Sequence, residues 1–152
     1  MKIIYPLITL FVFILLTFFN AYLVHAQSEP IFIKTSDIEW VKGTTPDGSA
    51  TFYSSVLHID PNTQATELVI KYGANTNIPW HFHSANETHT VISGKSFFEA
   101  DGKVVELDPG GFNYIPAKMV HRAWTTDQPV MYFITVDGAW DIIWVDKTKA
   151  NK

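Results

Sequence analysis

Three of the six histidines of this chain fall between His81 and His89, and Glu87 stands between the second and the third. Side chains alternate between the two faces of a β-strand, so His81 and His83 are expected to point the same way. They are separated by two strand rises of about 3.3 Å each, and two imidazoles at this spacing can share one metal ion. Glu87 follows the bend-forming residues "SAN" and can bring its carboxylate to the same side.

A third imidazole is available from a distant segment, "IPAKMVHRAW", in which His121 follows the turn after Pro116. Three neutral nitrogens and one anionic oxygen suit Mn, Fe, Co, Ni, Cu or Zn better than Ca or Mg. The chain has no cysteine, which excludes a closed thiolate zinc site. The alternative for the H-x-H pair alone is a pair of unrelated histidines, because this spacing also arises by chance.

The elements that must position these residues are short β-rich runs, separated by turn sequences such as "TPDG", "DPNT" and "DPGG". Asp101-Gly102, between two alternating runs, predicts a two-residue hairpin turn of the primed type. Many short strands at close spacing predict an all-β sandwich or barrel. The predicted strands are Ile38–Val41, Thr51–Ile59, Glu67–Tyr72, Trp80–His83, Thr88–Ser93, Ser96–Ala100, Lys103–Leu107, Phe112–Ile115, Val120–Thr125, Val130–Val136 and Trp140–Val145.

The first 26 residues differ from the rest of the chain. Lys2 is their only charge, an apolar run extends through Phe19, and "VHA" resembles a cleavage site. We therefore expect residues 1–26 to be a signal peptide, cleaved between Ala26 and Gln27, and the protein to be periplasmic or secreted. The alternative is an uncleaved leader that anchors the domain outside the cytoplasm, since spanning a bilayer takes about 20 apolar residues.

Residues 27–152 are expected to form a single domain with a packed core, because aromatic residues make up 14% of the chain. The full chain has a formal net charge of −4, and loss of Lys2 with the leader makes the domain more acidic. An acidic domain without a basic patch argues against nucleic acid and anionic membrane surfaces as partners. After cleavage no stable membrane span is expected.

The histidine cluster resembles the first motif of the cupin family, which has a glycine, H-x-H, three or four residues, E, six residues and G. This chain has His81-Phe-His83, three residues, Glu87, six residues and Gly94. The leading glycine is Gly73, two residues earlier than in the motif.

The second cupin motif has G, five residues, P-x-G, two residues, H, three residues and N. This chain has Gly110, five residues, Pro116-Ala-Lys118, two residues, His121, three residues and Thr125. Lys118 stands in place of the second glycine and Thr125 in place of the asparagine. Neither position is a ligand, so the departures concern the shapes of turns.

The resemblance implies a double-stranded β-helix, or jelly-roll, with one divalent metal (Fe, Mn, Ni, Zn or Cu) between its sheets. It implies the ligands His81, His83, Glu87 and His121. His89 shares the parity of Glu87 and is expected to point inward without binding the ion. It would be either a core histidine or a residue that contacts a ligand or substrate. A homodimer is common among proteins of this kind and is expected here.

The resemblance to dioxygenase cupins implies a metal-dependent oxygenase for a small organic molecule, in which Glu87 is both ligand and proton acceptor. The alternative is a non-catalytic exported module that binds a metal or a metabolite. The cupin fold hosts many chemistries, so the motifs do not decide between an enzyme and a binder.

Overall fold

The structure is a computed structural model that describes residues 29–146. The predicted signal peptide, residues 1–26, and its cleavage site lie outside the described residues. Contacts divide the chain into two units, Met1–Phe32 and Ile33–Lys152. In the described part of the first unit, residues 29–32 have no regular secondary structure, and all regular elements belong to the second. None of the helices within residues 29–146 is long and apolar enough to cross a membrane.

The second unit is built from strands, with one short 3-10 helix before the first of them. In chain order the elements are η1 (Thr35–Asp37), β1 (Val41–Thr44), β2 (Thr51–Ile59), β3 (Thr66–Tyr72), β4 (Asn77–Phe82), β5 (Glu87–Ser93), β6 (Ser96–Ala100), β7 (Lys103–Leu107), β8 (Phe112–Ile115), β9 (His121–Trp124), β10 (Val130–Val136) and β11 (Ile143–Trp144).

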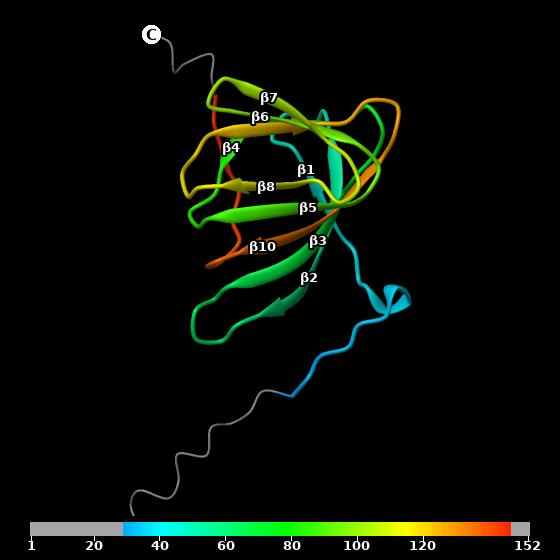
Figure 1. The fold of residues 1–152 in the computed structure, drawn as a ribbon, viewed down its shortest axis with the longest axis vertical. Helices are drawn as coiled ribbons and strands as arrows, with labels where there is room; N and C mark the ends of the chain where they lie inside the picture. The colour runs from blue at the N-terminus through cyan, green and yellow to red at the C-terminus, as the bar shows by residue number, and fades with distance from the viewer. Residues whose placement is uncertain (1–28, 147–152) are drawn as a thin grey trace, which may run out of the picture. The chain divides into compact units, whose positions relative to one another are not determined.

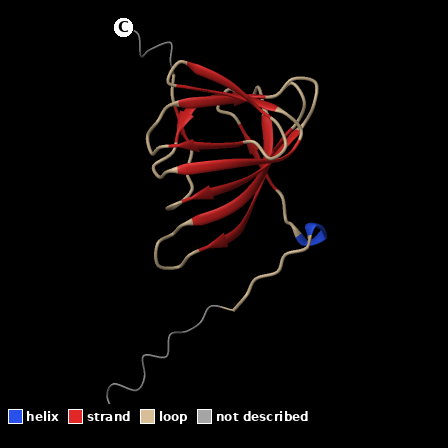
Figure 2. Cartoon of the chain, viewed as in Figure 1, coloured by secondary structure: helices blue, strands red, loops and turns tan. Residues whose placement is uncertain are grey.

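The strands form two antiparallel sheets that face each other (Figures 1 and 2). One sheet has the order β1-β2-β3-β10-β5-β8 and the other the order β11-β4-β9-β6-β7. Strands that are distant in the sequence are paired, such as β3 with β10 and β4 with β9. These crossovers confirm the predicted all-β jelly-roll barrel.

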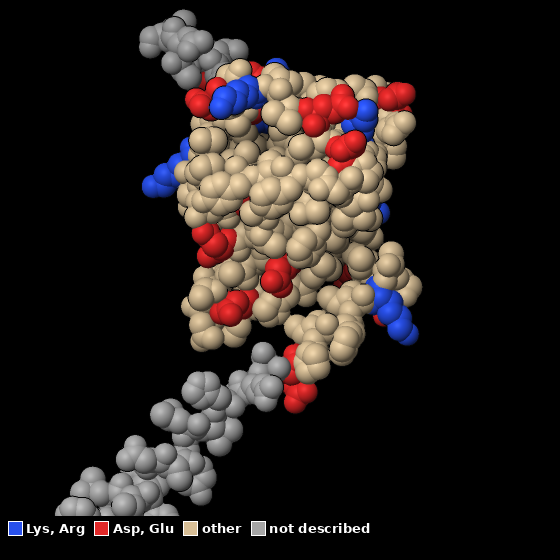
Figure 3. Space-filling view, viewed as in Figure 1, with Lys and Arg blue, Asp and Glu red and all other residues tan. Residues whose placement is uncertain are grey.

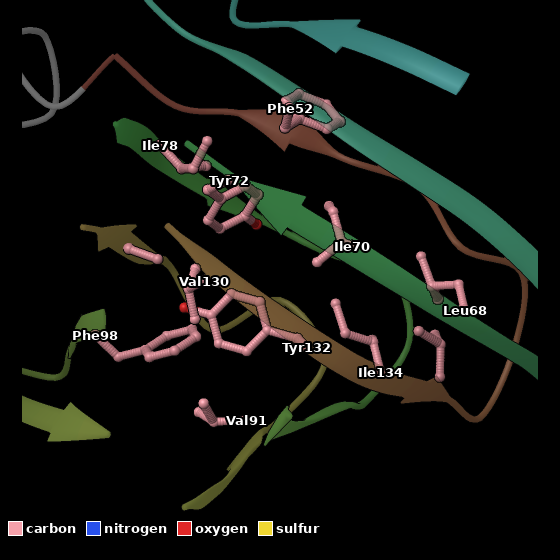
Figure 4. Packing of buried hydrophobic residues seen from close by; sticks show 12 residues of the cluster. Phe52, Leu68, Ile70, Tyr72, Ile78, Val91, Phe98, Val130, Tyr132 and Ile134 are labelled. Carbon is pink, nitrogen blue, oxygen red and sulfur yellow. The ribbon is translucent and has the colours of Figure 1, made fainter. Parts of the chain in front are cut away.

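The core lies between the sheets and is filled by alternate residues of their strands. β10 shows this most clearly, since every second residue from Val130 to Val136 is buried. In Figure 4, Leu68, Ile70 and Tyr72 of β3 lie beside Tyr132 and Ile134 of β10. Inward side chains therefore alternate with outward ones, as expected for a sandwich with one buried face per sheet.

Two glycine-containing turns explain features that the sequence singled out. Asp101 and Gly102 have φ angles of 49° and 70°, which confirms the primed hairpin turn between β6 and β7. Gly94, the last glycine of the first motif, has a φ of 78°, and a Cβ there would lie 1.9 Å from the carbonyl oxygen of Pro129. Only glycine fits this position without displacing the backbone.

Two predicted strands at the ends of the domain are largely wrong. Ile38–Val41 was expected as a strand, but β1 begins at Val41. Trp140–Val145 was expected as a strand, but only Ile143 and Trp144 pair with β4. The remaining residues of this second stretch cross the end of the barrel and contribute to the site described below.

The face of the barrel over β8 and β5 is mostly uncharged, and Figure 3 shows Lys, Arg, Asp and Glu side chains above this band, below it and at its left edge. Exposed apolar side chains of β5 and β8 include Ile92, Phe112 and Tyr114. Such patches are typical of surfaces that contact other molecules. The homodimer expected from the sequence remains a prediction.

Candidate metal centre

The two cupin-like motifs meet between the sheets, where strand register brings their histidines together. His81 of β4 pairs directly with His121 of β9, and their ring centroids are 4.3 Å apart. His83 follows the end of β4, with its ring centroid 5.1 Å from that of His81. The possible ligand atoms of these three histidines all lie within 4.8 Å of one another, and all three residues are buried.

Glu87 reaches the same place from the opposite sheet, as the first residue of β5. Its Oε2 lies 3.1 Å from Nε2 of His83 and 3.8 Å from Nε2 of His121. Only 1% of its surface is exposed. The structure therefore brings together all four residues that the sequence suggested as ligands.

Each of the three imidazoles is held by a backbone carbonyl through Nδ1. His81 donates to Pro79 at 2.7 Å, His121 donates to Met119 at 3.0 Å, and His83 donates to Asp141. Since a neutral imidazole carries one N–H, a proton on Nδ1 leaves Nε2 with a free lone pair. The backbone thus selects the tautomer in which each Nε2 can bind a metal.

Burial keeps two of these histidines neutral in the absence of a metal. It lowers the pKa of His81 to about 3, with further effects from His121 and His83. It also lowers the pKa of His121 to about 4, although the hydrogen bond to Met119 and the charge of Glu87 act in the other direction. A neutral imidazole is the form that binds a metal.

In the pair formed by Glu87 and His83, the carboxyl group favours its ionised form and the imidazole favours its protonated form. Burial opposes ionisation of Glu87, but His89 and His83 outweigh it and lower the pKa of Glu87 to about 2. Burial also opposes protonation of His83, but the negative charge of Glu87, whose Oε2 lies 3.1 Å from Nε2 of His83, outweighs it and raises the pKa of His83. A proton on His83 would therefore compete with a metal ion more strongly than a proton on His81 or His121.

The donor atoms fit a transition metal. Nε2 of His83 and Oε2 of Glu87 are buried without a hydrogen-bond partner within residues 29–146. Buried polar atoms are nearly always satisfied, so such atoms call for an explanation such as an ion. Three imidazole nitrogens with one carboxylate oxygen match the ligand preferences of Fe, Mn, Ni, Zn and Cu.

His89 points inward, as its parity predicted. Its Nε2 lies 3.5 Å from Oε2 of Glu87, and its Nδ1 lies 2.9 Å from Oδ1 of Asn113. The hydrogen-bond partner of His89 is thus the side chain of Asn113. His58 is partly exposed and bonded to Glu67 on neighbouring β3, outside the site.

A small cavity adjoins the histidine cluster and is almost filled by its walls. The space that remains is about 10 Å³, enough for about one water molecule. The lining residues are Phe52, Ile70, Tyr72, Ile78, His81, His83, Glu87, His89, Ile134, Trp140 and Ile142.

One wall of the cavity comes from residues 138–145, which we call the closing segment; Trp140 and Ile142 are its lining residues. Besides the pairing of β11 with β4, Asp141 holds it in place by accepting hydrogen bonds from the backbone N–H and hydroxyl of Ser84, at 2.8 and 2.6 Å. The carbonyl of Asp141 accepts from His83, so this segment also orients a candidate ligand. The roles of Asp141 and Trp140 were not predicted, because aromatic and apolar residues at alternating positions in this stretch indicated an ordinary strand.

The two departures from the second motif have structural counterparts. Lys118 has a φ of 65°, the left-handed conformation that the usual glycine adopts readily, and its N–H donates to the carbonyl of His83 at 2.8 Å. The hydroxyl of Thr125 donates to the carbonyl of Gly73 at 2.7 Å and accepts from the N–H of Thr76 at 2.9 Å. Both residues thus keep the turns in place despite the substitutions.

The family model of the cupin domain matches residues 68–137, from β3 to the residue after β10. This region contains all four candidate ligands. This match, together with the two-sheet barrel, identifies residues 68–137 as a cupin domain. No curated protein matches the chain.

Solved structures of the same fold share little sequence with this chain. One, from the crystal structures of the DMSP lyases RdDddP and RnDddQII, is 22% identical with a TM-score of 0.63, over 72% of this chain and 63% of that one. The chain thus spans less than two thirds of that protein. An RmlC-like cupin protein from Ralstonia eutropha JMP134 is 16% identical with a TM-score of 0.66, over 83% and 78%. A putative acetylacetone dioxygenase from Methylibium petroleiphilum PM1 is 13% identical with a TM-score of 0.63, over 81% and 85%. At these low sequence identities, the similarity shows that the proteins share a fold.

Proposed function

We propose that this protein binds one divalent transition metal through His81, His83, Glu87 and His121 and uses it to act on a small organic molecule, as an oxygenase. The observation that carries the proposal is the fixed tautomer of the three imidazoles. Each Nδ1 donates to a backbone carbonyl, so three Nε2 lone pairs meet the ionised Glu87 in a buried space.

The roles of the residues follow from their surroundings. A bound ion would supply Lewis acidity and, as Fe or Mn, sites for substrate and dioxygen. The three imidazoles hold the ion, and Glu87 balances part of its charge. The carboxylate of Glu87 lies 3.5 Å from Nε2 of His89, so these two groups can hold a proton between them. The apolar walls of the cavity exclude bulk water.

Comparison with other cupins supports a small-molecule ligand but leaves the reaction open. Lyase and dioxygenase are both among the functions named for structures with this fold. The alternative function is a non-catalytic module that holds a metal or metabolite. The cavity favours this alternative in one respect, since the remaining space of about 10 Å³ is too small for a substrate unless the walls move.

The two functions can be separated by metal analysis followed by oxygen uptake. Protein produced with its native metal should contain about one equivalent of Fe, Mn, Ni, Zn or Cu. The metal-loaded protein should consume oxygen with at least one member of a panel of small organic acids and diketones, and His121→Ala should not. Metal binding without turnover of any compound would favour the non-catalytic module.

We also propose that the protein is exported, with the leader cleaved between Ala26 and Gln27, so that the site operates in the periplasm or outside the cell. The support is the pattern of one positive charge, an apolar run and a small residue at the cleavage point. An uncleaved leader would anchor the same domain outside the cytoplasm.

A further inference from the structure

The indole nitrogen of Trp140 is a buried donor without a partner within residues 29–146. Trp140 belongs to the closing segment and lines the cavity together with the candidate ligands His81, His83 and Glu87. A buried N–H that has lost water and found no acceptor destabilises the state that contains it. An oxygen atom of a bound molecule would remove this penalty.

The formal charges around the cavity identify the kind of molecule that would fit. A divalent ion with three neutral imidazoles and the carboxylate of Glu87 leaves one net positive charge in a buried site. None of the residues that line the cavity is a lysine or an arginine. Burial raises the pKa of Tyr72 far above its usual value, with smaller effects from Tyr132 and Glu87, so its hydroxyl stays neutral. A single negative charge therefore brings the site to neutrality, whereas a multiply charged anion would be left unpaired.

The walls limit the size and the polarity of the molecule. Besides the candidate ligands and His89, they consist of aliphatic and aromatic side chains. The closing segment has a strand ladder of only two residues, those of β11, and hydrogen bonds at Asp141 and Val145 hold it at further points. Small displacements of Trp140 and Ile142 would admit a compact molecule with an apolar skeleton.

We propose that the cavity binds a compact organic monoanion, a short carboxylate or enolate with an apolar remainder, and that the indole N–H of Trp140 donates to one of its oxygens. This inference rests on the proposed metal site and adds the class of substrate and a residue that selects it. A molecule without this oxygen would leave the N–H of Trp140 unpaired and would therefore bind more weakly. A neutral analogue would leave the net positive charge of the site unbalanced, which disfavours its binding in the same way.

The inference is tested with protein loaded with Zn²⁺, which is diamagnetic. Isothermal titration calorimetry compares isobutyrate with its neutral analogue isobutyramide and with inorganic phosphate. Isobutyrate should bind at least tenfold more tightly than the other two. Trp140→Phe, which keeps an aromatic ring but removes the donor, should weaken isobutyrate binding about tenfold, the size of effect expected for a hydrogen bond to a charged acceptor. The matched control is Trp124→Phe, whose ring stacks on Phe97 and does not line the cavity.

The zinc content of each variant is measured first, which separates this inference from the metal site itself. Wild-type protein without zinc would contradict both. Full zinc content would contradict the inference alone if isobutyrate did not bind, if isobutyramide bound equally well, or if Trp140→Phe bound isobutyrate as wild type does. Should Trp140→Phe fail to fold, the indole N–H resonance of Trp140 in the wild-type protein decides. It should shift downfield as isobutyrate is added, and an unchanged resonance would overturn the inference.

Discussion

The metal-free protein should lose stability steeply in mild acid, because His81 and His121 are kept neutral in the fold. Burial is the main cause of their lowered pKa values, about 3 and about 4, compared with 6.5 for an ordinary histidine. Below pH 6.5 the unfolded chain takes up protons at both residues while the folded protein does not. The unfolded state therefore gains stability as the pH falls.

The size of this effect follows from the two shifts. Each proton that only the unfolded state binds changes the free energy of unfolding by about 1.4 kcal/mol per pH unit. Between about pH 6.5 and about pH 4.5, each histidine should contribute a loss of about 2 kcal/mol, or about 4 kcal/mol for the two. The raised pKa of His83 acts in the opposite sense, since its stabilising effect is present in acid and disappears as the pH rises through that pKa. The contribution of Glu87 is lost only at lower pH, from 4.5 toward about 2.

Urea denaturation in the presence of a chelator, followed by circular dichroism at both pH values, measures this loss. His121→Gln should remove about 2 kcal/mol of the pH dependence, even where it changes stability at either pH. His58→Gln, which removes a histidine outside the cavity, should retain the acid-induced loss of wild type. The reasoning is refuted if wild type is equally stable at both pH values, or if His121→Gln has the pH dependence of wild type.

Three further predictions concern backbone strain and processing. Lys118→Gly should raise the free energy of unfolding by about 0.5–1 kcal/mol, because glycine adopts the positive φ of this position without strain; unchanged or lower stability would contradict it. Gly94→Ala should lower it by about 2–4 kcal/mol, because the new Cβ would meet the carbonyl of Pro129. The control is Gly102→Ala, because Gly102 also has a positive φ but has open space around it; this change should lower the free energy of unfolding by only about 1 kcal/mol. Equal losses of stability in Gly94→Ala and Gly102→Ala would argue against a clash at position 94. Mass spectrometry of the exported protein should find Gln27 as its first residue, and an intact leader on exported protein would favour the membrane anchor.

The strands with regular alternation could be predicted from the sequence with their full bounds. β2, β6, β7, β8 and β10 begin and end where the pattern of apolar residues and turns indicated. In β6, β8 and β10 more buried residues alternate with more exposed ones, so local pattern and tertiary structure agree. β7 is exposed along most of its length, and its start follows from the Asp101-Gly102 turn. The parity of His81 and His83 and the inward direction of His89 followed from the same alternation.

The parts that could not be predicted depend on contacts between distant segments. Trp140 and Ile142 alternate as in a strand, but their side chains close the cavity, and the ladder is reduced to two residues. Asn113 lies inward between the exposed Phe112 and Tyr114, the reverse of what hydrophobicity suggests. The backbone carbonyls that select the histidine tautomers are not visible in a sequence at all, because every residue type carries one.

The central claim is that four residues from two sheets hold one metal ion, and metal content measures this most directly. Wild-type protein should contain about one equivalent of a divalent transition metal after gel filtration, by inductively coupled plasma mass spectrometry. His81→Ala and His121→Ala should each lose most of it, although His121 belongs to a different strand, and His58→Ala should lose none. Stoichiometric metal in both His81→Ala and His121→Ala, or none in wild type, would contradict the shared site.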